Sequence, residues 1–478
     1  MEQFGVTQSY RALRNGIRSY YRRHYPLTGR ARAWTELNPG AGAVSRLCHE
    51  PRVAVAVLEA MLAPHRSSGR LQVLQPCVAV SATVDADRVT SVTLRNLLTQ
   101  DETVVTADYV LDATETGDLL PLTGCEYVTG FESRAETGEP SAPTTSQPLN
   151  MQAVAVCFAV DHVDGDHTID KPSDYDAWRG YQPDFWGNPL FSWSAPNPRT
   201  LQPEARIFDP NPEDDPSAIQ ADLSKEGGDR NLWTFRRIAA RRNFVDGSYP
   251  SDITLVNWPQ IDYFDGPVID VPDAAHHLER ARDLSRSLLY WMQTEAPRPD
   301  GGTGFPGLRL RGDVTGGADG LAMAPYIRES RRIRAVRTVV EQDLSLAVRG
   351  SRGAVPYADT VGVGMYRIDL HPSTGGDHYI DIGASPFQIP LGALLPVRLS
   401  NLIAAGKNIG TTHITNGCYR LHPVEWNIGE VAGTLAAYCV RSGKAPQQVQ
   451  SDEADLATFQ QLLVAQGVEL RWPEVQGY

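Results

Sequence analysis

The sequence lacks the short motifs that mark several common enzyme classes. It contains no GxSxG, no HExxH, no paired CxxC and no Walker loop, so serine hydrolases, zinc enzymes and P-loop nucleotide triphosphatases have no anchor in it. Its six cysteines, in 478 residues, lie far apart at positions 48, 77, 125, 157, 418 and 439. In a chain of this length, that spacing predicts reduced, mostly buried thiols and a cytoplasmic protein.

Long apolar runs and basic tracts are also missing. No stretch approaches 18 uninterrupted apolar residues, and residues 1–27 hold no apolar signal segment, so we expect neither a membrane span nor secretion. The 44 lysines and arginines against 57 aspartates and glutamates give a net charge of −13. This balance argues against nucleic acid or an anionic membrane as the main partner.

Hydrophobic periodicity predicts how the chain is organised. Helical spacing predicts amphipathic helices over residues 8–23 and 51–62. The alternating pattern from 70 to 114 predicts an isolated strand, a β-meander and an apolar strand, "YVLDA", followed by a turn or short helix. Residues 150–320 hold much of the tryptophan, a strand at "MQAVAVCFAV" and a helix at "AAHHLERARDLSRSLLYWMQTEA".

A further helix is predicted over residues 325–344, "PYIRESRRIRAVRTVVEQDL". It holds arginines at positions 328, 331, 332, 334 and 337. Five cations so close together cannot all face a core, so we expect most of them on a solvated, ion-paired face. One or two could reach an anionic substrate or a phosphate.

Three stretches imitate ligand sites but lack part of the pattern. The string "GGTGFPG" (301–307) matches GxGxxG, yet no apolar strand precedes it, so we expect a loop. The stretches "DHVDGDH" (161–167) and "HPSTGGDH" (371–378) have the residue types of metal ligands without the glutamate of a calcium loop. We interpret both as solvated turns and predict no metal site.

Residues 401–437 have the pattern of a cofactor-binding segment. "NLIAAG" predicts a buried strand ending at Gly406, where a backbone can approach a ligand closely, and Lys407 and Asn408 then offer donors. After a polar loop, Pro423 can open a helix whose N-terminus presents unpaired N–H groups. That arrangement suits the N1–C2=O edge of a reduced flavin; the alternative is a tightly packed helix without a ligand.

Small residues in this helix, including Gly429, favour close packing. The strand "YVLDATETGD" adds to the interpretation. In two-dinucleotide-fold flavoproteins, a strand ending in Ala-Thr and followed by a glycine runs beneath the adenine-proximal part of the cofactor. Asp112, Ala113, Thr114 and Gly117 fit that type, although Glu115-Thr116 intervenes before the glycine. A strand and turn without a ligand is the alternative.

The chain resembles the FAD-dependent oxidoreductase family, which is related to the glutathione-reductase-type flavoproteins. The matching stretches, in the family's order, are "VSRLCHEPRVAVAVLEAML", "YVLDATETGDLLPLTGCEYVTG", "LVNWPQIDY", "PYIRESRRI", "IPLGALLPVRLSNLIAAGKNIGTTHITNG" and "RLHPVEWNIGEVAGTLAA". The resemblance implies a bound FAD and hydride transfer to or from a small organic substrate. It places Gly406, Lys407 and Asn408 near the ribityl and pyrophosphate region.

The same resemblance implies roles for other residues. The loop with Thr412 and His413 would approach the isoalloxazine, and the helix after Pro423 would face its pyrimidine edge. His413 is the candidate proton donor or acceptor, with a purely structural hydrogen bond as its alternative. The candidates for the substrate pocket are Arg46, Cys48 and Trp258, although core packing explains the tryptophans equally well.

The sequence departs from the family at its start, where a strand, GxGxxG and a helix are expected before "EQFGVTQSYRALRNGI". Without that unit the pyrophosphate loses its main cradle. We expect that the polypeptide continues upstream; the alternative is a shortened homologue with weak cofactor affinity, acting as a binding or scaffold protein.

These inferences predict an α/β flavoprotein of two interleaved parts. Residues 1–148 and 386–478 would form a three-layer FAD-binding domain with a mixed or parallel sheet, incomplete at its N-terminus. Residues 149–385 would form an inserted α+β substrate domain. The substrate, the electron acceptor and the oligomeric state do not follow from the sequence.

Overall fold

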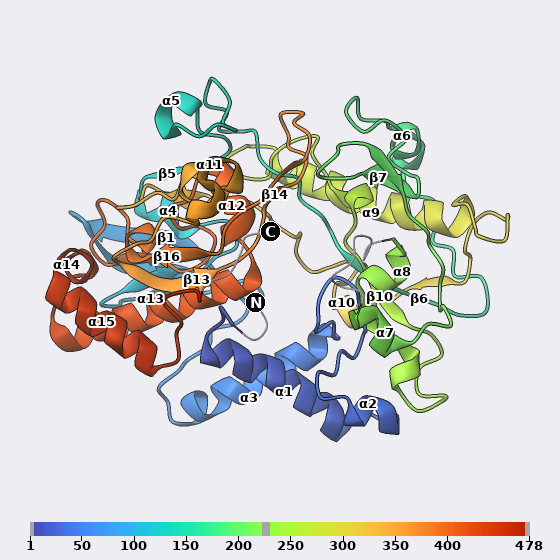
Figure 1. The fold of residues 1–478 in the computed structure, drawn as a ribbon, viewed down its shortest axis with the longest axis horizontal. Helices are drawn as coiled ribbons and strands as arrows, with labels where there is room; N and C mark the ends of the chain where they lie inside the picture. The colour runs from blue at the N-terminus through green and yellow to red at the C-terminus, as the bar shows by residue number, and fades with distance from the viewer. Residues whose placement is uncertain (1–3, 222–229, 474–478) are drawn as a thin grey trace.

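The computed structural model describes residues 4–221 and 230–473 and shows two lobes with three N-terminal helices along one side of both (Figure 1). The first lobe is built from residues 77–137 and 332–465, and the second lobe from residues 158–315. Small sheets and helices alternate in both lobes, which confirms the mixed α/β class. The three-layer arrangement, the inserted domain and the domain boundaries stay predictions.

The first lobe contains the predicted β-meander. Strands β1, β2 and β3 pair antiparallel in that order, with Cys77 opposite Asn96 and Val92 opposite Val105. No isolated strand precedes the meander in the described part of the chain. The elements of this lobe are β1 (Cys77–Asp85), β2 (Arg88–Asn96), β3 (Glu102–Val105), β4 (Val110–Asp112), α4 (Leu119–Thr123), β5 (Tyr127–Val128), α5 (Arg134–Thr137), β12 (Arg332–Ile333), η3 (Glu341–Asp343), α11 (Leu346–Arg349), η4 (Gly350–Arg352), β13 (Thr360–Gly364), β14 (Ile368–Leu370), β15 (Ile380–Ile382), β16 (Phe387–Pro390), η5 (Leu391–Leu394), β17 (Leu402–Ala404), α12 (His413–Tyr419), α13 (His422–Ser442), α14 (Pro446–Ser451) and α15 (Glu453–Ala465).

The central feature of this lobe is the pair formed by β4 and β17. These strands run parallel, with Leu402 opposite Val110 and Ala404 opposite Asp112, so their carboxyl ends meet at one edge. Both are short; β17 is apolar and fully buried, whereas β4 ends in the buried Asp112. Helix α13 packs against β13 and contributes buried residues such as Ile428 and Val431 to the same core. The edge where β4 and β17 end therefore stands on a rigid apolar base.

The second lobe has a four-stranded antiparallel sheet in the order β11-β6-β10-β9, and the long helix α9 shares a buried core with strands β6 and β10. Most of the tryptophans predicted to gather here lie in its core, and Trp178, Trp186 and Trp233 are fully buried. Its elements are β6 (Phe158–His162), α6 (Tyr175–Gly180), β7 (Ser194–Pro196), β8 (Pro203–Ala205), α7 (Pro216–Ala221), α8 (Leu232–Phe235), β9 (Arg237–Ala239), η1 (Arg241–Asn243), β10 (Ile253–Val256), η2 (Pro259–Ile261), α9 (Ala274–Thr294), β11 (Leu308–Leu310) and α10 (Gly312–Thr315).

The N-terminal helices connect the lobes. They are α1 (Gln8–His24), α2 (Gly29–Ala33) and α3 (Pro51–Ser67). The predicted helices α1 and α3 exist, and α3 continues past its expected end at residue 62. Their core side chains pack with Ile238 and Ile253 of the second lobe, while Ser9 donates to Glu430 of α13.

The prediction of a helix over residues 325–344 is wrong. The segment is mostly extended, with only the short strand β12 and the 3-10 turn η3. The arginines do not share a solvated face, because Arg328 and Arg332 are fully buried, whereas Arg334 and Arg337 are exposed. By contrast, "GGTGFPG" forms a loop as expected.

Candidate functional site

The first part of the site is the turn after β4. Asp112 is fully buried, and its Oδ1 accepts hydrogen bonds from the amide of Thr114 at 2.9 Å and from its hydroxyl at 2.6 Å. Oδ2 accepts from the Leu119 amide at 3.2 Å, and Gly117 adopts a positive φ of 66°. Burial raises the pKa of Asp112. Asp112 and Thr114 thus shape the turn from within, while Ala113 is exposed.

The second part is the end of β17. Asn408 is fully buried; its Nδ2 donates to the Asp112 carbonyl at 2.9 Å, and its Oδ1 accepts from the Gly406 amide at 3.2 Å. At Gly406, a Cβ would have Glu425 Oε2, at 3.7 Å, as its nearest neighbour outside the adjoining residues. A Cβ at the buried Gly406 would therefore make an ordinary contact with Glu425, and the hydrogen bonds of Asn408 are made within the protein.

Charged groups gather beside this edge. The Nζ of Lys407 lies 2.6 Å from Oε1 of Glu115; the lysine is 5% exposed and the glutamate 57%. Burial raises the pKa of the Glu425 carboxyl to about 7, against the opposing effect of Lys407. Burial, and then Lys407, lower the pKa of His422. A cation, two carboxyls and a neutral imidazole thus share the region in front of α13.

Helix α13 begins where the sequence predicts. Pro423 lies in its first turn, and the N-cap residue Leu421 offers no side-chain hydrogen bond. Pro423 has no N–H, and the amides of Val424 and Glu425 donate to the Leu421 carbonyl at 2.8 and 2.9 Å, so this helix end contributes the partial positive charge of its dipole rather than a set of free donors. At Gly429 a Cβ would lie 3.4 Å from the Ala405 carbonyl oxygen, so the helix crosses close to the end of β17.

His413 is not in a loop but begins helix α12, and only 1% of it is exposed. Its ring stacks on Phe131 at a centroid distance of 3.6 Å, and its Nδ1 lies 2.9 Å from Glu329 Oε2. Although burial raises the pKa of Glu329, His413 and Arg332 lower it to about 2. This enclosed network supports the structural alternative for His413; a role at the flavin stays a prediction.

Thr412 is the N-cap of α12. Its hydroxyl accepts from the Thr415 amide at 3.1 Å and donates to Glu139 at 2.6 Å. Burial raises the pKa of Glu139 to about 7. The threonine pair is the sequence signal that could have revealed the helix. Contact between Thr412 and a cofactor stays a prediction.

A cavity of about 280 Å³ opens between four parts of the chain. Its lining comes from α1, from the segment 44–49, from the second lobe and from His422 at the start of α13. Cys48 lines this cavity, and its amide donates to Asn38 Oδ1 at 2.7 Å; its contact with a substrate stays a prediction. Just before this segment, the backbone at Gly40 packs directly on the second lobe, because a Cβ there would lie 2.1 Å from the Arg237 carbonyl oxygen.

The structure does not bring Arg46 and Trp258 to this cavity. Arg46 is exposed, and its carbonyl accepts from Arg18 at 3.4 Å. Trp258 is buried in the core of the second lobe, 5.8 Å from the ring of Phe208. Neither is among the described residues that line the cavity, and their contact with a substrate stays a prediction.

Sequence reasoning missed a buried polar network in which Asp262 contacts both Arg328 and His371. The arginine run and "HPSTGGDH" were the only sequence signals. Their partner, Asp262, lies 66 and 109 residues away along the chain.

Metal-binding clusters and bilayer-spanning helices are both absent from the described ranges. No three histidine, cysteine, aspartate or glutamate side chains in residues 4–221 and 230–473 are placed to hold a metal ion. In the same ranges, no helix has both the length and the apolarity needed to cross a bilayer.

Comparison with known proteins adds one match. Residues 1–463 match the model of one protein family, described as FAD dependent oxidoreductase. No curated protein and no solved structure matches the chain.

Proposed function

This chain is a member of the FAD-dependent oxidoreductase family, and from that membership we propose that it transfers hydride between FAD and a small organic substrate. FAD is the cofactor of the family, in agreement with the cofactor expected from the sequence. When bound, FAD supplies the electron chemistry, and the protein supplies binding, orientation and electrostatics. The family match is the observation that carries the proposal.

The residues around the β4–β17 edge fit part of this cofactor. Gly406, which has no side chain, the nearly buried cation Lys407 and the dipole of α13 together suit a flat, oxygen-rich ligand. We propose that Gly406, Lys407 and the first turn of α13 hold the flavin half of FAD. The close approach of α13 at Gly429 keeps the helix in position for this contact.

The carboxyls favour one portion of the cofactor over another. Glu115 and Glu425 would repel a pyrophosphate, but they can accept hydrogen bonds from hydroxyl groups. We therefore propose that this region faces the ribityl chain, with Lys407 balancing the carboxylate charge. The turn containing Asp112, Ala113, Thr114 and Gly117 would support the adenine-proximal part.

The cavity beside His422 is the proposed substrate pocket. Its volume of about 280 Å³ suits a small organic molecule, and its lining mixes apolar side chains with Cys48, His49 and Arg236. Burial lowers the pKa of His49, so that ring is neutral at pH 7. The alternative of a scaffold without redox activity gains no support from the family match.

The test is a titration of the purified protein, made from its whole reading frame, with FAD followed by flavin fluorescence and visible absorbance. We expect FAD to bind stoichiometrically. Under anaerobic conditions, a substrate should then bleach the visible absorbance of the bound flavin. Protein that folds but neither binds FAD nor shows a flavin spectrum would contradict the proposal and support the scaffold alternative.

A further inference from the structure

The cavity beside His422 has cations in its lining, although the protein as a whole has a net charge of −13. Two arginines, Arg14 and Arg236, line it, and no aspartate or glutamate of the described chain does. A concave surface with charge of one sign concentrates ions of the opposite sign. The sign of these charges therefore favours an anionic ligand.

The histidines of the lining connect this cavity to α13. Burial and Lys407 lower the pKa of His422, and Arg236 adds to this effect, so its guanidinium acts electrostatically on the first residue of the helix. Burial also lowers the pKa of His49, whose Nδ1 lies 3.0 Å from the Glu50 carbonyl oxygen. Both rings are thus neutral at neutral pH, and the arginines are the charged groups of the lining.

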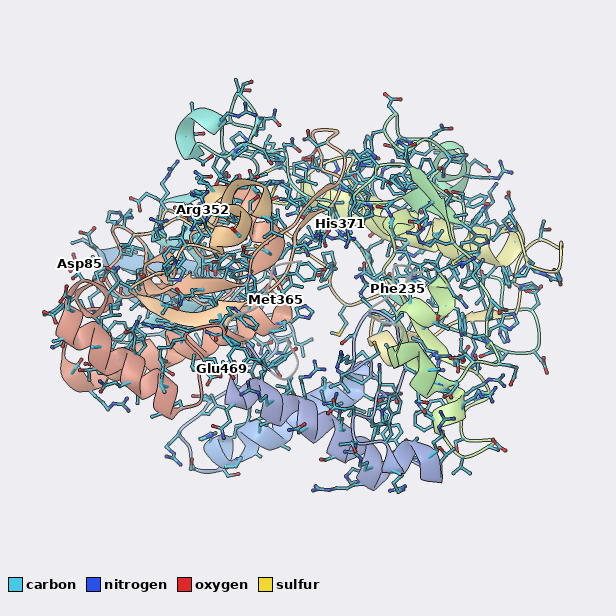
Figure 2. All side chains as sticks on the ribbon, in the orientation of Figure 1. Asp85, Phe235, Arg352, Met365, His371 and Glu469 are labelled. Atoms are coloured by element: carbon cyan, nitrogen blue, oxygen red, sulfur yellow. The ribbon has the colours of Figure 1, made fainter. Side chains whose placement is uncertain are left out.

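Backbone hydrogen bonds hold Arg236 beside two walls of the cavity. Arg236 is the C-cap residue of α8, and its carbonyl accepts from the Leu255 amide at 3.0 Å. The Val44 amide donates to the Phe235 carbonyl at 2.9 Å. Val44 and Leu255 both line the cavity. Figure 2 shows Phe235 on the side of the second lobe that faces the first lobe.

The guanidinium of Arg236 forms no ion pair with a carboxylate of residues 4–221 and 230–473. It lies over the Phe235 ring at 5.0 Å, and its buried Nε has no hydrogen-bond partner in the described chain. The next residue, Arg237, pairs with Asp214 at 2.6 Å and with Asp252 at 2.8 Å. Native proteins leave few buried polar atoms unpaired, and each one calls for a partner such as water or a ligand. Arg236 is therefore a cation available to a ligand.

Carboxylates close to the lining in sequence do not neutralise Arg236. Glu50, which follows His49, accepts from the Tyr249 hydroxyl at 3.0 Å. No described ion pair joins Glu425 to Arg236, and burial raises the pKa of Glu425 to about 7. The positive charge of Arg236 thus remains uncompensated in the cavity.

Aliphatic side chains make up much of the remaining lining. They are Leu13, Ile17, Val44, Leu47, Ile238 and Leu255. Such walls favour the hydrocarbon part of a ligand, and a volume of about 280 Å³ restricts it to a small molecule. A pyrophosphate has more than one negative charge and no hydrocarbon part. A monocarboxylate has one charge to pair with Arg236 and hydrocarbon to bury.

We propose that this cavity binds a small organic acid whose carboxylate pairs with Arg236 and whose hydrocarbon part packs on the aliphatic lining. The inference rests on the proposed function, in which the cavity is the substrate pocket, and it names the class of that substrate. A planar guanidinium can donate two parallel hydrogen bonds to a carboxylate. Because His422 lines the same cavity, the bound acid lies beside the start of α13. Arg236 is a positioning residue and takes no part in hydride transfer.

The same lining predicts which molecules are excluded. An amine carries an ammonium group at neutral pH, and Arg236 repels that charge. No described lining residue offers the carboxylate that an ammonium group needs. A neutral alcohol of the same shape gains the aliphatic contacts but leaves Arg236 without an anion. Carboxylates are therefore expected to bind more tightly than alcohols, and alcohols more tightly than amines.

The test is isothermal titration calorimetry of the whole protein, both without FAD and loaded with it. The probes are benzoate, benzyl alcohol, benzylamine and inorganic phosphate. We expect benzoate to bind most tightly, and Arg236→Met to weaken its binding roughly 10- to 100-fold, as for the loss of one charge-assisted interaction. Arg236→Lys should lose less, because the charge remains while the planar fork is lost. Absence of benzoate binding in both forms, or equal affinity in wild type and Arg236→Met, would overturn the inference.

Arg298→Met is the matched control. Arg298 also lines a cavity of the second lobe, but it pairs with Asp300. We expect its removal to leave benzoate affinity unchanged, and an equal loss in both arginine variants contradicts a specific site at Arg236. Circular dichroism checks that the variants fold. Should Arg236→Met fail to fold, Arg236→Lys and the order of the four probes in the wild type still decide the matter.

The outcomes separate this inference from the proposed function. Protein that never binds FAD contradicts the proposed function, while benzoate affinity without FAD still decides whether Arg236 holds an acid. Tighter binding of phosphate than of benzoate overturns the carboxylate class. Weaker FAD binding in Arg236→Met, with benzoate affinity unchanged, places the cofactor rather than a substrate at Arg236. In FAD-loaded protein, benzoate should shift the visible absorbance of the flavin, and an unchanged spectrum despite binding contradicts a substrate pocket beside it.

Discussion

The side-chain amide of Asn408 donates to the main-chain carbonyl of Asp112 across 2.9 Å and joins the carboxyl ends of β17 and β4. We expect Asn408→Ala to lower the free energy of unfolding by about 2 kcal/mol, because it removes two buried hydrogen bonds and takes the acceptor from the Gly406 amide, while the Asp112 carbonyl keeps its bond from the Ala405 amide. Urea unfolding measures this loss, and FAD affinity should fall with it.

The control for this variant is Asn197→Ala. Asn197 accepts two backbone hydrogen bonds and donates one to Glu204, but in an exposed loop, where water replaces them. A loss of less than about 0.5 kcal/mol is expected there. Equal losses in the free energy of unfolding would show that Asn408 contributes no more to stability than an asparagine in an exposed loop.

Lys407→Met tests the proposed flavin contact. The substitution removes a nearly buried cation beside Glu115, and we expect FAD to bind roughly 10- to 100-fold more weakly, as for the loss of one charge-assisted hydrogen bond. The readout is flavin fluorescence titration. Lys444→Met, which removes a lysine paired with Asp455 elsewhere on the surface, is the control. Unchanged affinity in Lys407→Met would remove this residue from the site.

Glu425→Gln tests the carboxyl whose pKa is raised to about 7. A carboxyl with a raised folded-state pKa contributes stability that is fully present below about 4.5 and is lost as pH rises through about 7. Relative to Glu425→Gln, the free energy of unfolding of the wild type should therefore fall over that range. The fall should be smaller than about 3 kcal/mol, because the carboxyl is only half-buried. Denaturant unfolding from pH 4.5 to 8.5 measures the difference, and parallel curves would refute the assignment.

Arg332→Met tests the buried network around His413. Arg332 is fully buried and donates to Glu132 at 3.0 Å and to the Gly130 and Thr411 carbonyls at 2.7 and 3.0 Å, besides its contact with Glu329. Leaving two carboxylates without this cation should cost about 3–5 kcal/mol. Thermal unfolding measures the loss.

Arg398→Met is the control for Arg332→Met. Arg398 is a surface arginine paired with Glu126 and Asp87, and its removal should cost less than about 1 kcal/mol. If the two arginine variants lose the same stability in thermal unfolding, burial does not determine how much these ion pairs contribute to stability.

Local periodicity predicted the elements that it governs. Helices α1, α3, α9 and α13, the meander β1–β3 and the strands β4 and β17 all have strong hydrophobic patterns, and each exists close to its expected bounds. The polar loop before Pro423 was the exception, because it contains α12. Gly417 obscured that helix; a Cβ there would lie 2.9 Å from the Asp369 amide nitrogen, so the packing of α12 on β14 requires glycine.

The arginine segment failed for a different reason. Its helical spacing was accidental, since the partners that stabilise an extended chain come from distant residues such as Glu132 and Asp262. No local sequence pattern predicts a partner that lies 200 residues away in the sequence. The same reason hid the Asp262–His371 pair, while His413, singled out by the resemblance, proved to be enclosed.

The cavity beside His422 joins α1, the segment 44–49, the second lobe and the start of α13. A ligand that binds in this cavity also stabilises the packing of these four parts against one another. A ligand at 100 times its dissociation constant would stabilise the assembled form by about 2.7 kcal/mol. Hydrogen exchange in α1 should then slow whenever the cavity is filled, and candidate substrates can be ranked by that protection before any turnover is observed.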